Sequence, residues 1–223
     1  MDNLERQFYE AAFNNDINVV KEAIEKGVNV NVVNEQNRSA LMRCAKRGRI
    51  QMTRLLLDNG AKTDLRDYHE KTALMGACKK GYLEVAQMLL EAGTDVNAYD
   101  YNKNNSLMRA SFYGFDDVVR LLLQYNADLN AQDTKGRTAL MEACSAGNVA
   151  VIDVLLSRGA DVNLQDNMGC TALMRVAYAG FDELVKLLVK NGADTKIVDK
   201  DGRTAKDYYA ERNNNEEILS ILK

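Results

Sequence analysis

Residues 133–165 read DTKGRTALMEACSAGNVAVIDVLLSRGADVNLQ, and this stretch decides the fold. It opens with the letters DTKG, which contain residue types that form tight turns. Thr138 follows at a position suited to cap a helix, because its hydroxyl oxygen can accept a hydrogen bond from one of the first free backbone N–H groups. The stretch therefore predicts a turn and then a short helix that begins at Ala139 and is ended by Gly147.

The second half of the same stretch predicts another helix. Residues from about 149 to 157 place apolar side chains on one side at helical spacing, and Gly159 ends the pattern: Val149, Ile152, Leu155 and Leu156. Two short helices joined by a loop cannot hide their apolar faces alone. We therefore expect this unit to need neighbours of the same kind.

The unit recurs at a fixed period of 33 residues. TALM begins at Thr72, Thr138 and Thr171, and near copies begin at Ser39 and Asn105. Leucines recur in register with it at two positions, one in each helix: Leu41, Leu74, Leu107, Leu140 and Leu173 in the first, and Leu56, Leu89, Leu122, Leu155 and Leu188 in the second. These columns predict one continuous core built by stacking.

This pattern resembles the ankyrin repeat: a 33-residue unit with T-x-L opening its first helix, LLL in its second and GADVN after it. The resemblance implies an all-α solenoid of helix-loop-helix units joined by β-hairpin-like turns. It divides one domain, 1–223, into an N-terminal capping repeat, five full repeats and a C-terminal capping repeat: 1–33; 34–66, 67–99, 100–132, 133–165 and 166–198; 199–223.

The chain departs from the family pattern in one motif. The family usually has TPLH where this sequence has TALM, and the chain contains no proline. Alanine is the best helix former, so we expect the helix to survive the exchange. Methionine replaces the histidine, which favours soft packing between units over a polar link. The proline-free, asparagine-rich composition resembles that of ankyrin proteins from bacteria or from parasites with AT-rich genomes. Some such proteins act inside a host cell.

Sequence motifs for catalysis are not found. The chain has one histidine, His69, in a turn, and lacks the GxxxxGK[ST], GxGxxG and HExxH patterns. Its four cysteines form no CxxC pair, and we interpret three of them as small hydrophobic residues and Cys170, beside a turn, as oxidisable: Cys44, Cys78, Cys144 and Cys170. We therefore expect no enzyme, no metal and no cofactor.

Composition limits the partners and the location. A net charge of −3 argues against a general DNA or RNA binder, because nucleic-acid-binding domains are usually strongly basic. No apolar run reaches the length of a membrane span, and MDNLERQFYE lacks the features of a signal peptide. We expect a cytoplasmic monomer.

The resemblance implies a concave binding groove, lined by the turn tips and the exposed side of each first helix. Its positions carry basic residues in the first two full repeats and aromatic residues further on. Residues 34–99 contain 11 Lys and Arg against 8 Asp and Glu, a net +3, whereas each flanking segment is −3. We predict that the partner contacts these residues: Arg38, Arg43, Lys46, Arg47, Tyr68, His69, Lys71, Lys79, Lys80, Tyr101, Phe112, Tyr113, Lys135 and Tyr178.

Three functions remain open at this point. The first is a protein-binding module for an acidic protein or peptide with apolar anchors, since Tyr and Arg often anchor interfaces. The second is binding of an anionic ligand, a lipid headgroup or RNA, through the basic residues of 38–80. The third is an enzyme with a deep pocket that no motif reveals. The structural alternative is that the charges form only a solvated face, and that Phe112 or Tyr113 packs under the neighbouring turn.

Overall fold

Each copy of the TALM sequence begins a short helix, and the residue before the alanine caps it. The hydroxyl oxygen of Thr138 accepts a hydrogen bond from the backbone N–H of Met141 at 3.2 Å. Ser39, Thr72 and Thr171 make the same bond to the methionine three residues on. One of the first unpaired N–H groups of each helix is thereby satisfied, which fixes where the helix starts.

The computed structural model describes all residues 1–223 and contains helices without a sheet. It consists of two compact units, which we describe separately. Unit 1 comprises residues 1–106 and 124–127, and unit 2 comprises residues 107–123 and 128–223.

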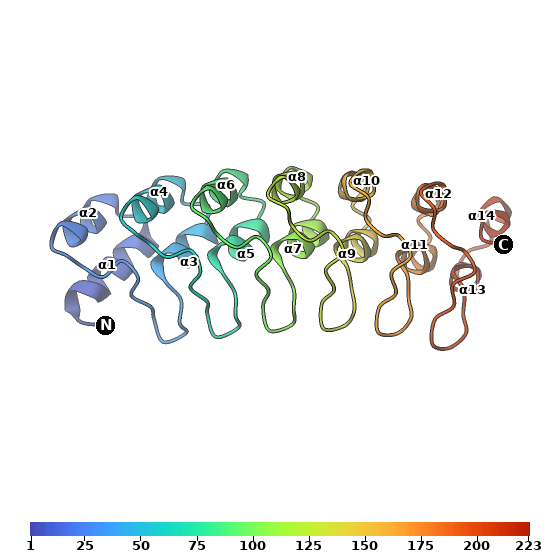
Figure 1. Cartoon of the computed structure of the whole chain (residues 1–223), viewed down its shortest axis with the longest axis horizontal. Helices are drawn as coiled ribbons and strands as arrows, with labels where there is room; N and C mark the ends of the chain where they lie inside the picture. Colours follow the sequence, from blue (N-terminus) through green and yellow to red (C-terminus); the bar gives the residue numbers. More distant parts are fainter. The chain divides into compact units, whose positions relative to one another are not determined.

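Unit 1 is built from pairs of antiparallel helices in two rows, with the odd-numbered helices in one row and the even-numbered helices in the other (Figure 1). Within each row, neighbouring helices pack side by side. The pairs are α1 (Asn3–Asn14) with α2 (Ile17–Glu25), α3 (Ala40–Ala45) with α4 (Ile50–Asp58), and α5 (Ala73–Cys78) with α6 (Leu83–Glu91).

Unit 2 repeats the same arrangement, and the first residue of its first helix belongs to unit 1 (Figure 1). The pairs are α7 (Ser106–Tyr113) with α8 (Asp116–Gln124), α9 (Ala139–Ala146) with α10 (Val149–Ser157), α11 (Ala172–Ala179) with α12 (Asp182–Lys190), and α13 (Ala205–Ala210) with α14 (Glu216–Ile221). The predicted helices that start at 139 and 149 are confirmed, as is the all-α repeat fold.

Long loops project from the odd-numbered row and are organised by a recurring aspartate. The Oδ1 atom of Asp67 accepts hydrogen bonds from the backbone N–H groups of His69 at 2.8 Å and Lys71 at 3.1 Å. The same pair of bonds recurs at Asp100, Asp133, Asp166 and Asp199. The carboxylate thus accepts hydrogen bonds from loop N–H groups that have no neighbouring strand to bond to.

Backbone hydrogen bonds join successive loops within each unit. In unit 1 the N–H of Tyr101 donates to the carbonyl oxygen of His69 at 3.2 Å, and in unit 2 the N–H of Asn167 donates to that of Lys135 at 2.9 Å. The loop tips of one unit therefore form a linked row rather than separate loops, which limits their motion relative to one another.

In every pair except the last, a left-handed residue lies two positions after the second helix, as the spacing of the glycines predicts. Gly159 has a φ of 82°, and Asn126, which replaces glycine in the same column, has a φ of 61°. Asn is the other residue that tolerates this conformation, because its short side chain can bond locally. The exception therefore keeps the backbone geometry of the repeat.

The core follows the two leucine columns. Leu74 and Leu89 are fully buried in unit 1, and Leu140 and Leu155 are buried in unit 2. The methionine of the TALM motif is buried in every copy, which confirms the packing role expected of it. At the C-terminal end Asp207 is exposed and completes a capping box with Thr204.

Candidate functional site

Five cations of unit 1 gather around the end of α3, and we call them the basic cluster: Arg38, Lys46, Lys71, Lys79 and Lys80. Lys46 caps α3 and is exposed. Burial, followed by the positive charges of the other four cations, lowers the pKa of its ammonium group. An anion bound beside Lys46 would therefore stabilise its positive charge, which the four neighbouring cations repel.

Close packing of α3 against α5 produces this cluster. A Cβ atom added to Gly76 would lie only 3.3 Å from the Cβ of Lys46, so the two helices approach closely at that point. Arg38 is partly neutralised, since its Nε lies 3.2 Å from the Oδ2 of Asp67. The ammonium groups of Lys46, Lys71 and Lys80 form no ion pair.

Arg43 and Arg47 are engaged elsewhere in unit 1. Their guanidinium carbons lie 3.7 Å and 3.8 Å from the centre of the Phe13 ring, and Arg43 also lies 5.2 Å from the ring centre of Tyr9. Both arginines therefore hold the capping helix α1 in place, a role that the sequence analysis did not assign to them. Phe13 and Tyr9 are four residues apart, as are the two arginines, so helical spacing on both sides was the signal.

The loop tips of unit 1 carry the exposed aromatic residues. The side chain of Tyr68 is 66% exposed and that of Tyr101 is 69% exposed. His69 is exposed in the same row of tips. These fractions leave most of each tyrosine free for contact with a partner.

In unit 2, Phe112 and Tyr113 are both exposed, by 43% and 45%. Their rings meet edge to face with centres 5.2 Å apart, and Tyr113 also stacks on Phe115 at 6.4 Å. Lys135 is exposed at a loop tip. The rings of Phe112 and Tyr113 therefore form a pair at the surface, and Phe115 packs against Tyr113.

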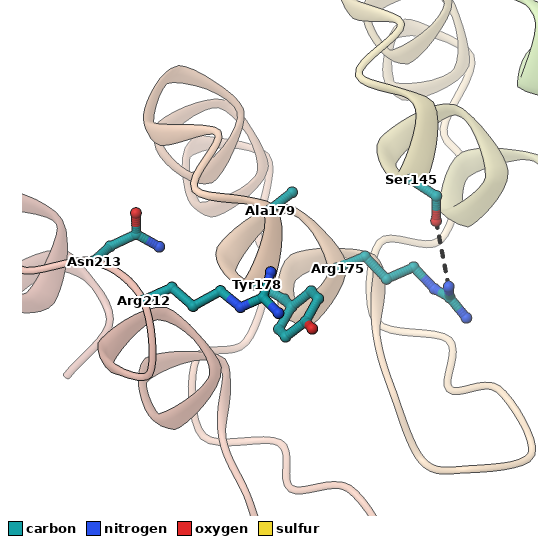
Figure 2. Close-up of a pocket in the computed structure, with 6 residues that line it drawn as sticks. All are labelled: Ser145, Arg175, Tyr178, Ala179, Arg212 and Asn213. Carbon is teal, nitrogen blue, oxygen red and sulfur yellow. Dashed lines mark hydrogen bonds between the residues drawn. The ribbon is translucent and has the colours of Figure 1, made fainter.

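Unit 2 also contains a pocket of about 450 Å³, which we call the arginine pocket (Figure 2). Its walls come from α9, α11 and the segment between α13 and α14: Ser145, Arg175, Tyr178, Ala179, Arg212 and Asn213. The guanidinium carbon of Arg212 lies 4.2 Å from the centre of the Tyr178 ring, and Nη1 of Arg175 donates to the Ser145 hydroxyl at 3.3 Å. Only Tyr178 of this pocket was predicted from the sequence.

A second, smaller pocket adjoins the first. It encloses about 170 Å³, and we call it the apolar pocket: Cys170, Met174, Arg175, Tyr178 and Tyr208. The Tyr208 hydroxyl donates to Oδ2 of Asp199 at 2.7 Å and lies 3.5 Å from the Cys170 sulfur. The Tyr208 hydroxyl in its wall is thus already paired, whereas the buried Nε of Arg175 has no hydrogen-bond partner.

Arg175 was missed because its position in the first helix varies along the chain. The fourth residue after the cap is Arg43, Gly76, Arg109, Glu142 or Arg175. In the structure Arg43 and Arg175 of this column are half-buried and reach the preceding repeat, where Arg43 contacts Phe13 and Arg175 contacts Ser145. The charged residues in that column were the signal that could have identified Arg175 from the sequence.

Two further features, a metal site and a membrane span, are absent from the structure. No group of three or more His, Cys, Asp or Glu side chains is arranged to hold a metal ion. No helix is both long enough and apolar enough to pass through a lipid bilayer. The sites that remain are surfaces and shallow pockets formed by repeated helices and loops.

This chain belongs to the ankyrin repeat family. A family model described as ankyrin repeats (3 copies) matches residues 8–100, 99–166 and 155–223. The structure is similar to the crystal structure of the human ASB11 ankyrin repeat domain, with a TM-score of 0.86, 27% sequence identity and 97% coverage of each chain. No curated protein matches the chain. Ankyrin repeats are in general protein–protein interaction modules, and the family is typically non-enzymatic.

Proposed function

We propose that this protein is a non-catalytic module that binds an acidic partner protein through the basic cluster and the exposed tyrosines of unit 1. Unit 2 carries four further predicted contact residues that are exposed, three of them aromatic and one basic: Phe112, Tyr113, Tyr178 and Lys135. Because family and fold support protein binding only in general, the choice of surface rests on the charges and exposures described above.

The observation that carries the proposal is the repulsion at Lys46. Three of the five cations in the basic cluster have no carboxylate partner. Burial, and after it the charges of the other four cations, lowers the pKa of Lys46. Charges of one sign that are gathered on a surface attract a partner of opposite charge. An acidic segment of a partner would relieve the repulsion and gain several charge-assisted hydrogen bonds.

Exposed aromatic rings in the same unit supply the apolar part of recognition. Tyr68 and Tyr101 combine large contact area with a hydroxyl group and few rotatable bonds, which is why tyrosine is common among residues that dominate binding energy. Arg43 and Arg47 are not part of this surface in the proposal, since Phe13 engages them.

A capture experiment with charge-matched variants tests the proposal. The test variant carries Lys46→Glu and Lys80→Glu. The control carries Lys21→Glu and Lys62→Glu, which change the net charge equally at exposed positions of the same unit. Lysate is first treated with nuclease and cleared of membranes, and captured proteins are identified by mass spectrometry.

We expect an acidic protein that the wild type and the control capture and the test variant loses. Its affinity, measured with the purified partner, should fall roughly tenfold or more in the test variant and weaken with added salt. Equal loss in both variants would contradict a specific surface. Binding that survives only without nuclease treatment, or only with anionic vesicles, would favour RNA or a lipid headgroup instead.

A further inference from the structure

We propose that the arginine pocket and the apolar pocket of unit 2 together bind a peptide segment in which a carboxylate side chain and an aliphatic side chain point the same way. The inference rests on the proposed protein-binding function but concerns pockets of unit 2, which share only Tyr178 with the contact residues proposed above. It names the chemistry of the segment that this unit recognises.

Arg212 supplies the positive charge that would pair with the carboxylate of the bound segment. This side chain is exposed and forms no ion pair, whereas its neighbour Glu211 pairs with Arg203. Stacking on Tyr178 occupies one face of the guanidinium and holds the group in place (Figure 2). The edge that carries the N–H donors remains available for a bidentate carboxylate.

Arg175 shapes the pocket without adding an unpaired charge. Its Nη2 pairs with the nearly buried carboxylate of Asp166, and its Nη1 contacts the Ser145 hydroxyl. The lining therefore holds one uncompensated positive charge, which a singly charged carboxylate balances. A phosphate dianion would leave an excess negative charge beside Asp166, so the pocket favours the carboxylate.

The apolar pocket supplies the second half of recognition. Its volume of about 170 Å³ is close to that of cavities that hold a benzene-sized group, which is also the size of a branched aliphatic side chain. Met174 and the rings of Tyr178 and Tyr208 form its walls. Burying an aliphatic side chain there removes apolar surface from water and leaves the hydrogen bond of the Tyr208 hydroxyl to Asp199 in place.

The two pockets share Arg175 and Tyr178, so their occupants must come from neighbouring positions of one segment. In an extended peptide, residues i and i+2 lie on the same side at about 6.5–7 Å. A glutamate and a leucine separated by one residue meet this requirement.

The test uses the probe acetyl-Leu-Ser-Glu-Ser-Leu-amide, which offers leucine two residues to either side of the glutamate. Binding to the isotope-labelled full chain is followed by NMR, which detects weak affinities. We expect saturable shifts at the backbone amides of Tyr178, Ala179 and Asn213. Replacing the probe's Glu by Gln, or both Leu by Ser, should weaken binding about fivefold or more.

Two variants separate the halves of the site, and Arg158→Gln at an exposed position of the same unit is the control. Arg212→Gln should remove the preference for the Glu probe over the Gln probe, with no such change in the control. Cys170→Leu, checked for unchanged helicity, should fill the apolar pocket and remove the preference for leucine over serine. The Lys46→Glu, Lys80→Glu variant should bind the probe like the wild type.

Several results would overturn the inference: no saturable shift at the pocket, an equal effect of Arg158→Gln and Arg212→Gln, or tighter binding of the probe with phosphoserine in place of glutamate. Because the probe bypasses the basic cluster, failure here leaves the function proposed for unit 1 intact. Likewise, loss of capture through Lys46 and Lys80 without loss of probe binding would separate the two sites.

Discussion

The guanidinium carbon of Arg47 lies 3.8 Å from the centre of the Phe13 ring. With Arg43 at 3.7 Å from the same ring, the aromatic side chain of the capping helix is engaged by two cations. These arginines hold the capping repeat against the first full repeat, so their positive charges contribute to the free energy of unfolding.

We predict that Arg47→Ala lowers the free energy of unfolding by about 0.5–1 kcal/mol, the usual value of a partly exposed cation–π contact. Urea denaturation measures this loss, with the exposed, unpaired Arg54→Ala as a control that should change little. In a cycle with Phe13→Leu, the loss should largely disappear because the π-face is gone. An unchanged loss would assign the effect to packing alone.

A second prediction contrasts the core and the surface of unit 2. Leu140 is 1% exposed, so Leu140→Ala should lower the free energy of unfolding by about 2–5 kcal/mol through the cavity it leaves. Phe112→Ala should cost less than about 1.5 kcal/mol, since that ring is 43% exposed. Chemical denaturation of both variants gives the ranking. The reverse order would show that the columns have been assigned to the wrong faces.

Features set by residues close together in the chain could be predicted from the sequence more fully than contacts between distant residues. The cap at Thr138 and the left-handed residue at Asn126 were predictable, because both obey local rules about side-chain hydrogen bonds and backbone sterics. The contact of Arg212 with Tyr178 was not, because it joins side chains of adjacent repeats in rotamers that only packing selects. The repeat unit and the stacking of its leucine columns could thus be predicted from the sequence, whereas this contact between surface side chains of adjacent repeats could not.

Thiol reactivity provides a third prediction. Burial raises the pKa of the Cys44, Cys78 and Cys144 thiols to about 12, so at pH 8 almost none of them is the reactive thiolate. Cys170 is only half-buried. Iodoacetamide should therefore label Cys170 first in the native protein and all four cysteines in denaturant, as mass spectrometry would show. Labelling of Cys78 as fast as Cys170 would mean that unit 1 opens readily.

The last prediction concerns the pH dependence of the loop at Asp67, which opens the second full repeat. Burial by itself would raise the pKa of the Asp67 carboxyl, but the N–H groups of Lys71 and His69 and the Arg38 guanidinium outweigh it and lower this pKa below 3.8. Since the folded-state pKa is below the unfolded one, the stability that it contributes is present above about pH 4 and is lost as the pH falls through the folded value.

Asp67→Asn isolates this contribution. The loop itself should persist, because Asn34 makes the same two backbone hydrogen bonds in the preceding loop. At pH 7 the variant should be less stable by about 1–3 kcal/mol, the usual effect of losing a charged acceptor. The difference from the wild type, measured by urea denaturation, should shrink as the pH falls below 3.8. A difference that stays constant over this range would show that shape, and not charge, makes Asp67 important to the loop.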